Sequence, residues 1–217
     1  MAEKESVYNC IRLGLLIVAF SSGITVIGTM TALESKFNSC IILSDVVWDD
    51  PKYQCEDANG EKKEHCVMVL DTPSTCFFIV KYEYWACSIS VIWFVYTIIR
   101  LSREYEYSRG VYVLGMTSII YCLLSLASAC ILLAAYHKLC NGLLKVELPS
   151  HPTCKDFEAP GIWQADVDNL GISFIPLLRT AQAMSWISCM SWLGLFMIYL
   201  ADIFSLDILP ERFVDDY

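Results

Sequence analysis

The segment HKLCNGLLKVELPSHPTC, residues 137–154, contains two copies of His-x-x-Cys. Zinc accepts two histidines and two cysteines in a tetrahedral site. The segment offers such a set in His137, Cys140, His151 and Cys154. The same two cysteines could instead form a disulfide, and closing a loop of about 15 residues stabilises a fold by roughly 3 kcal/mol in the chain-entropy model. The choice between these chemistries depends on the compartment that the segment faces, and therefore on the elements that flank it.

Those elements are dominated by apolar residues. The chain is 217 residues long, 56% hydrophobic and 18% charged. A soluble domain carries about 25% charged residues, and a bilayer-spanning helix needs roughly 20 consecutive apolar residues. Four stretches meet that length, at about 13–33, 77–100, 111–136 and 172–204. They predict an all-α membrane protein, a single domain over residues 1–217 in which four transmembrane helices form a bundle. The first stretch exceeds the roughly 7–15 residue core of a cleaved signal peptide, so we expect it to remain as a span.

The segments between the spans differ in length, which restricts the topology. Residues 34–76 and 137–171 form two long loops, whereas the N-terminus, the link 101–110 and the C-terminal tail are short. Because four spans alternate in direction, the short segments share one side of the membrane and the long loops the other. Basic residues flank the spans on the short-segment side, as the positive-inside rule requires of cytosolic flanks. These residues are Lys4, Arg12, Arg100, Arg103 and Arg109.

The cysteines support the same orientation. Of 11 cysteines, an even set falls in the two long loops, as an oxidising compartment favours. These are Cys40, Cys55, Cys66, Cys76, Cys140 and Cys154. We therefore expect cytosolic termini and lumenal or extracellular loops, in the plasma membrane or an endomembrane of the secretory pathway.

In such a compartment the opening segment favours a disulfide between Cys140 and Cys154 over a zinc site. His137 lies where a helix leaves the membrane, and an imidazole there serves more simply as an interfacial anchor. We expect two disulfide-containing loops and no bound metal.

Short motifs in the loops and spans follow one another in a distinctive order. SCIILSDVVW places Cys40 shortly after the first span and Trp48 eight residues later. TCFF places Cys76 at the mouth of the second span, and ASACILLAAYHKLCN ends the third span with Cys140. AQAMSWISCMSWL lies in the fourth span. Over about residues 10–204 this order resembles the transmembrane protein 179 family, including its 179B branch. The resemblance implies four spans with two cysteine-bearing loops, and it implies no enzymatic activity.

The resemblance also suggests a disulfide pattern for the first loop. Cys55 and Cys66 look like additions to the family's loop cysteines, and two cysteines added together bond most simply to each other. Cys40 and Cys76 then remain at the two ends of the loop and are expected to pair. The rival scheme joins Cys76 to Cys140 across the two loops.

Ionisable residues inside a span are the default functional candidates in a membrane protein. Lys81 and Glu83 lie in the first turns of the second span, and Arg179 lies near the start of the fourth. We expect all three within about two turns of the interface, where long side chains reach toward water. Asp202 and Asp207 lie at the opposite side, in the headgroup region. No charged residue falls near the middle of a span, which argues against an ion pathway or proton relay through the monomer.

Small residues recur every four positions in the third and fourth spans, a pattern that lets helices approach closely. The two tryptophans of the fourth span are expected on other faces, toward lipid or a partner helix. The residues expected at helix-packing or partner interfaces are Ala181, Ser185, Cys189, Trp186, Trp192, Ser125 and Ala129.

The sequence contains no glycine-rich phosphate loop, no nucleophile elbow and no cluster of His, Asp and Glu within the spans. We therefore expect no enzyme and no cofactor. The net charge of −9 disfavours nucleic acid and a polybasic contact with anionic lipid. The expected partners are membrane lipid and another integral membrane protein, which makes the chain an accessory or scaffold subunit of a larger channel, receptor or transporter complex. The alternative is a homo-oligomer with a pore or transport path between subunits.

Overall fold

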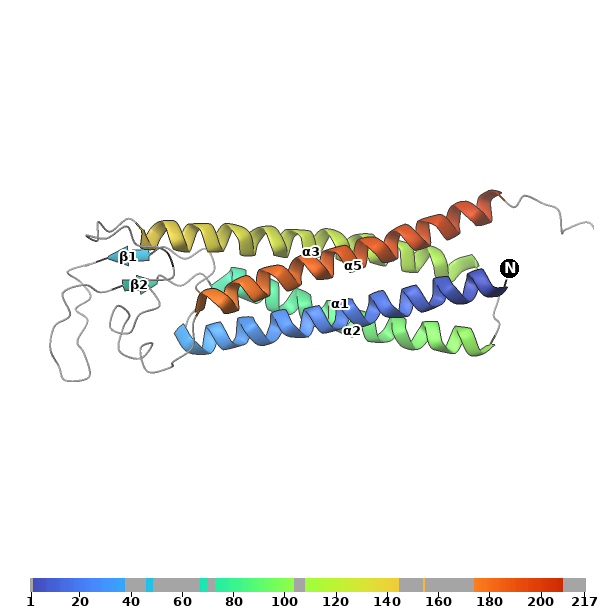
Figure 1. Ribbon diagram of the computed structural model, residues 1–217, viewed down its shortest axis with the longest axis horizontal. Coiled ribbons are helices and arrows are strands. Elements are labelled where there is room, and N and C mark those ends of the chain that lie inside the picture. The colour runs from blue at the N-terminus through green and yellow to red at the C-terminus, as the bar shows by residue number, and fades with distance from the viewer. Residues whose placement is uncertain are drawn as a thin grey trace, which may run out of the picture. The chain divides into compact units, whose positions relative to one another are not determined.

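The structure is a computed structural model that describes residues 2–37, 46–48, 67–69, 73–103, 108–144, 154 and 174–208. Within this part of the chain, four long helices dominate (Figure 1). They are α1 (Ala2–Phe37), α2 (Pro73–Arg103), α3 (Ser108–Leu143) and α5 (Phe174–Ile208). Each helix contains a stretch that is long and apolar enough to cross a membrane. These stretches are Val7–Ser35, Cys76–Leu101, Gly110–Gly142 and Phe174–Phe204. The prediction of an all-α integral membrane protein with four spans is confirmed.

Helix is the expected state of these segments, because hydrocarbon offers no partner for a backbone N–H or C=O group. The helices continue beyond the apolar runs into polar residues, so each helix is longer than its predicted span. Proline lies in the first turn of two helices, as Pro73 in α2 and Pro176 in α5. At that position its missing N–H breaks no helical hydrogen bond.

Two short strands accompany the helices. β1 (Val46–Trp48) and β2 (Val67–Val69) pair in the antiparallel direction, with Val46 opposite Val69 and Trp48 opposite Val67 (Figure 1). Valine and tryptophan are residues that strands favour. The sequence does not predict this pairing, because three-residue runs are too short to show the alternation of a strand.

The chain divides into two compact units, and each of the four helices contributes a segment to both. The first unit holds Met1–Ile24, Tyr84–Ala127 and Ser185–Tyr217. The second unit holds Thr25–Glu83 and Ser128–Met184.

The second unit is built around a cluster of buried apolar side chains from all four helices. These side chains are Val26, Met30, Leu33, Cys76, Ile79, Leu132, Ala135, Leu139, Phe174, Ile175, Leu178 and Ala181. Lipid tails are as apolar as leucine, so moving such residues from lipid into the bundle yields little hydrophobic free energy. Close van der Waals packing between the helices is therefore the main stabilising contribution here.

In the first unit, glycine permits a close approach of α5 to α1. A Cβ atom at Gly194 would lie 3.1 Å from a terminal methyl group of Leu15. That separation is tighter than most real Cβ contacts, so a side chain larger than hydrogen would displace Leu15. Gly194 thus belongs with the small residues that let membrane helices come close together.

Candidate functional site

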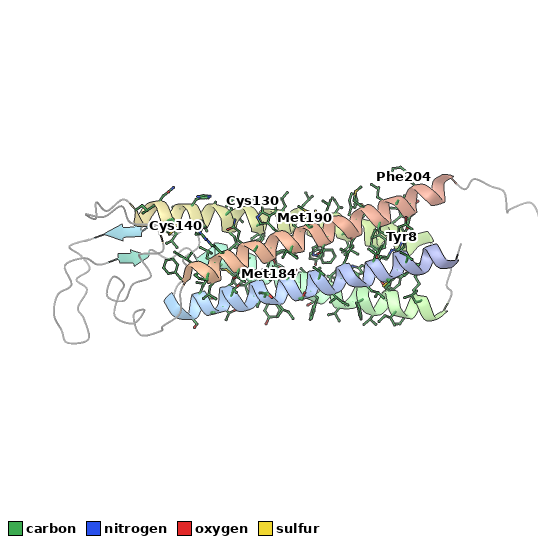
Figure 2. The ribbon with its side chains drawn as sticks, viewed as in Figure 1. Tyr8, Cys130, Cys140, Met184, Met190 and Phe204 are labelled. Atoms are coloured by element: carbon green, nitrogen blue, oxygen red, sulfur yellow. A yellow bond between two sulfur atoms is a disulfide. The ribbon has the colours of Figure 1, made fainter. Side chains whose placement is uncertain are left out.

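Cys140, labelled on the last turns of α3 in Figure 2, is bonded to Cys154. The Sγ–Sγ distance is 2.06 Å and the Cα–Cα distance is 5.4 Å. This is the pairing that the sequence predicts, and it uses both thiols that a zinc site would need. Cys76 is also disulfide-bonded, to a partner outside the described residues. Because Cys140 is bonded to Cys154, the rival pairing of Cys76 with Cys140 is wrong.

The other predicted disulfide cysteines, Cys40, Cys55 and Cys66, lie outside the described residues, as does His151. The pairings of Cys40 with Cys76 and of Cys55 with Cys66 stay predictions.

The small residues expected at helix interfaces are all buried within the chain itself. In the first unit these are Ser125, Ser185 and Cys189, and in the second unit Ala129 and Ala181. The Cys189 thiol lies 3.8 Å from the backbone oxygen of Cys122, which brings α5 against α3. An approaching protein would not reach these side chains without opening the bundle.

Trp192 also packs inside the first unit. Its side chain is fully buried and stacks on Tyr121 of α3, with the ring centroids 5.0 Å apart. The expectation that Trp192 lies on a different face from the small residues is wrong. Trp192 comes three residues after Cys189 and seven after Ser185, spacings that place all three on one side of a helix. Trp186 is half-buried.

A charged cluster joins α1 to α5 in the first unit, where the sequence predicts only charged residues at the membrane interface. Arg12 is 3% exposed and forms a salt bridge with Asp202. Its Nη1 donates a hydrogen bond of 2.7 Å to Asn9 Oδ1. Its guanidinium carbon lies 5.1 Å from the centre of the Tyr199 ring, in cation–π geometry. The sequence contains one signal for this cluster: on each helix the two members are three residues apart and share a face.

The three ionisable residues predicted near the opposite ends of the spans divide into two kinds. Lys81 is exposed, with its Nζ 3.9 Å from the centre of the Phe77 ring. Arg179 is exposed and donates a hydrogen bond of 2.6 Å to the Tyr136 hydroxyl. Both lie as anchoring side chains are expected to lie.

Glu83 does not. Its side chain is 0% exposed, and neither carboxyl oxygen has a hydrogen-bond partner in the part of the chain that the structure describes. The expectation that Glu83 reaches toward water is wrong. A residue two positions along a helix is turned by about 200°, so an outward Lys81 directs Glu83 inward. Its buried neighbours on that face are Ile79, Ala86 and Ser90.

The exposed surface of the spans consists mainly of large apolar side chains, and α2 is the least covered helix. In an apolar stretch of 18 residues, 22% of α2 is buried inside the protein. The corresponding shares are 33% in α1, 39% in α3 and 33% in α5. In the first unit α2 presents Tyr84 at 61% exposure and Trp85 at 66%. Beside it, α1 and α2 enclose an apolar groove of about 190 Å³. The groove is lined by Leu16, Ile17, Phe20, Ser90, Val91 and Phe94.

Comparison with known proteins gives a family and no closer relative. Residues 9–207 match the family model described as the transmembrane protein 179/179B claudin domain. Neither the curated proteins nor the solved structures contain a significant match. The match covers most of the chain and agrees with the resemblance seen in its motifs, and the chain therefore belongs to the transmembrane protein 179/179B family.

Proposed function

We propose that this protein is a non-enzymatic accessory subunit that binds a larger integral membrane protein through the exposed face of α2. The observation that carries the proposal is the low coverage of α2 by its own bundle. Aromatic side chains are the usual energetic centre of protein interfaces. Tyr84 and Trp85 supply two of them, side by side, on a helix that is otherwise apolar.

The occupant that fits this face is a transmembrane helix. Five of the outward residues of α2 in the first unit follow one another in steps of three and four, the spacing at which two helices pack side by side in a membrane. They are Trp85, Ser88, Ile92, Val95 and Ile99. The Ser88 hydroxyl donates to the Tyr84 carbonyl at 2.9 Å, so it brings no unpaired polar group to the contact. The neighbouring groove has room for a side chain of the partner helix.

The exposed faces also favour this role over a homo-oligomeric pore. A pore between subunits needs polar side chains on the surfaces that meet, whereas the strongly exposed residues of the spans are mainly leucine, isoleucine, valine, methionine and aromatic residues. Most of the serines in the spans are instead buried, and Ser90, Ser118, Ser125 and Ser191 donate to carbonyls of their own helix.

Site-specific photo-crosslinking in native membranes tests the proposal. A photoreactive residue at Trp85 should form a crosslink to one distinct integral membrane protein. Leu123 on α3 and Met190 on α5 serve as controls, because both are exposed to a similar degree on other helices. Met190 is labelled in Figure 2. The control positions should give lipid adducts without that product. A crosslink from Trp85 to a second copy of the chain would favour the homo-oligomer, and adducts with lipid alone would contradict both functions.

A further inference from the structure

Glu83 is a carboxyl group inside a membrane-spanning helix that the proposed function does not use. It lies seven residues into the span Cys76–Leu101, which at about 1.5 Å per residue is roughly 10 Å along the helix. Its side chain is fully buried, and both oxygens lack a hydrogen-bond partner among the described residues. The buried Ser90, two turns further along the same face of α2, is already engaged, because its hydroxyl donates to the Ala86 carbonyl at 2.8 Å.

No buried positive charge of the described second unit accompanies this carboxyl. Where the structure describes their side chains, the charged and titratable residues of that unit on α1, α2, α3 and α5 are exposed, apart from Tyr82, which is buried, and Tyr136, which is half-buried and accepts a hydrogen bond from Arg179. The exposed ones are Glu34, Lys81, Cys130, His137, Lys138 and Arg179. In the first unit the buried Arg12 is engaged by Asn9 and Asp202.

An ionised carboxylate in such surroundings is strongly unfavourable unless a cation neutralises it. A metal ion needs several oxygen ligands around it, and the described residues hold no group of three His, Cys, Asp or Glu side chains that would bind one. The other buried side-chain atoms without partners are three N–H donors and one hydroxyl, on Arg12, Trp93, Trp192 and Ser188. N–H donors repel a cation. A proton needs no ligand set.

We propose that Glu83 is a proton-binding site within the membrane-spanning helices. The carboxyl holds its proton while α2 is packed, and it releases the proton when α2 moves far enough to admit water. On release the O–H bond breaks, the electron pair stays on the carboxylate and the proton passes to water. The state of the bundle is thereby coupled to the proton concentration.

Infrared spectroscopy of the protein in phosphatidylcholine nanodiscs tests the site directly. At neutral pH the wild type should show the carbonyl band of an un-ionised carboxylic acid, and Glu83→Gln should lose it. Glu34→Gln is the matched control, because Glu34 is an exposed glutamate of the same unit. A wild-type spectrum without the band would overturn the proposal. If Glu83→Gln does not fold, the glutamate carboxyls of the wild type are labelled with ¹³C, and the carbonyl band should then shift in frequency. A band that does not shift would also overturn the proposal.

The equilibrium of unfolding gives a second test. A glutamate in water loses its proton near pH 4.3, so above this pH the unfolded chain binds one proton fewer than the packed chain. Raising the pH therefore favours unfolding of the wild type. Between about pH 5 and pH 8 the unfolding constant of the wild type, divided by that of Glu83→Gln, should rise by up to tenfold per pH unit. If this ratio does not change with pH, the proposal is contradicted. In the control, the unfolding constant of the wild type divided by that of Glu34→Gln should not change with pH.

Discussion

One arginine and one glutamate are buried in the described spans, and the protein accommodates them differently. Arg12 receives a carboxylate from Asp202, an amide oxygen from Asn9 and the face of the Tyr199 ring. Glu83 receives none of these from the described residues. The paired Arg12 holds α1 and α5 together, whereas the unpaired Glu83 carboxyl is expected to bind a proton while it is buried. The first is expected to contribute to stability and the second to respond to protons.

Removing Arg12 should therefore destabilise the bundle. Arg12→Met leaves the Asp202 carboxylate only 23% exposed and without its counter-charge. Removing one partner of a buried ion pair costs more than removing a polar contact between membrane helices. We expect a loss of unfolding free energy between these two cases, of about 1–3 kcal/mol. Unfolding in bicelles by added detergent measures it. The double variant Arg12→Met/Asp202→Asn should recover part of the loss, and Lys81→Met, which removes an exposed charge, should change little. Equal effects of Arg12→Met and Lys81→Met would disprove the role assigned to the pair.

Peptide mapping without reduction tests the cysteine chemistry. The expected crosslinked peptides are Cys140 with Cys154, as the structure shows, and Cys40 with Cys76 and Cys55 with Cys66, as the family resemblance implies. A peptide that joins Cys76 to Cys55 or Cys66 would reject the pattern inferred for the first loop.

At the scale of the helices, the small residues of α5 set how closely its neighbours approach. Ala181 is fully buried in the core of the second unit, while Ala183, two residues later, is exposed. Ala181→Leu should overpack this core and cost about 1–3 kcal/mol. Ala183→Leu adds the same atoms on the exposed face and should have almost no effect. The same detergent titration compares the two variants, and a harmless Ala181→Leu would show that the core is not closely packed there.

The helices were predictable from the sequence because hydrocarbon imposes a single requirement: an uninterrupted apolar run of sufficient length. The direction in which each side chain points was less predictable. The four-residue spacing of Ala181, Ser185 and Cys189 indicates one helix face, and Trp192, seven residues after Ser185, is buried on the same face. The pairing of Arg12 with Asp202 joins residues 190 positions apart. No local pattern records which two helices meet at that point.

At the scale of the whole molecule, the orientation in the membrane is a prediction that rests on the distribution of charged residues and cysteines. We expect the link between α2 and α3 to face the cytosol. Ser108→Cys, at the start of α3, should react with an impermeant maleimide only after the plasma membrane is permeabilised. The wild type measures the background from native thiols. Labelling of Ser108→Cys on intact cells would contradict this orientation. The opposite orientation would place the disulfide between Cys140 and Cys154 in the reducing cytosol.

The central claim is that this four-span protein works as a subunit of a larger membrane complex, held by the exposed face of α2. Native mass spectrometry of the protein released from its own membranes in lipid nanodiscs measures this most directly. The account predicts one copy or a fixed number of copies bound to a second, larger integral membrane protein. Trp85→Ala should dissociate that complex, whereas Leu123→Ala should leave it intact. A wild type that has the mass of one chain, or of several identical chains, would contradict the account.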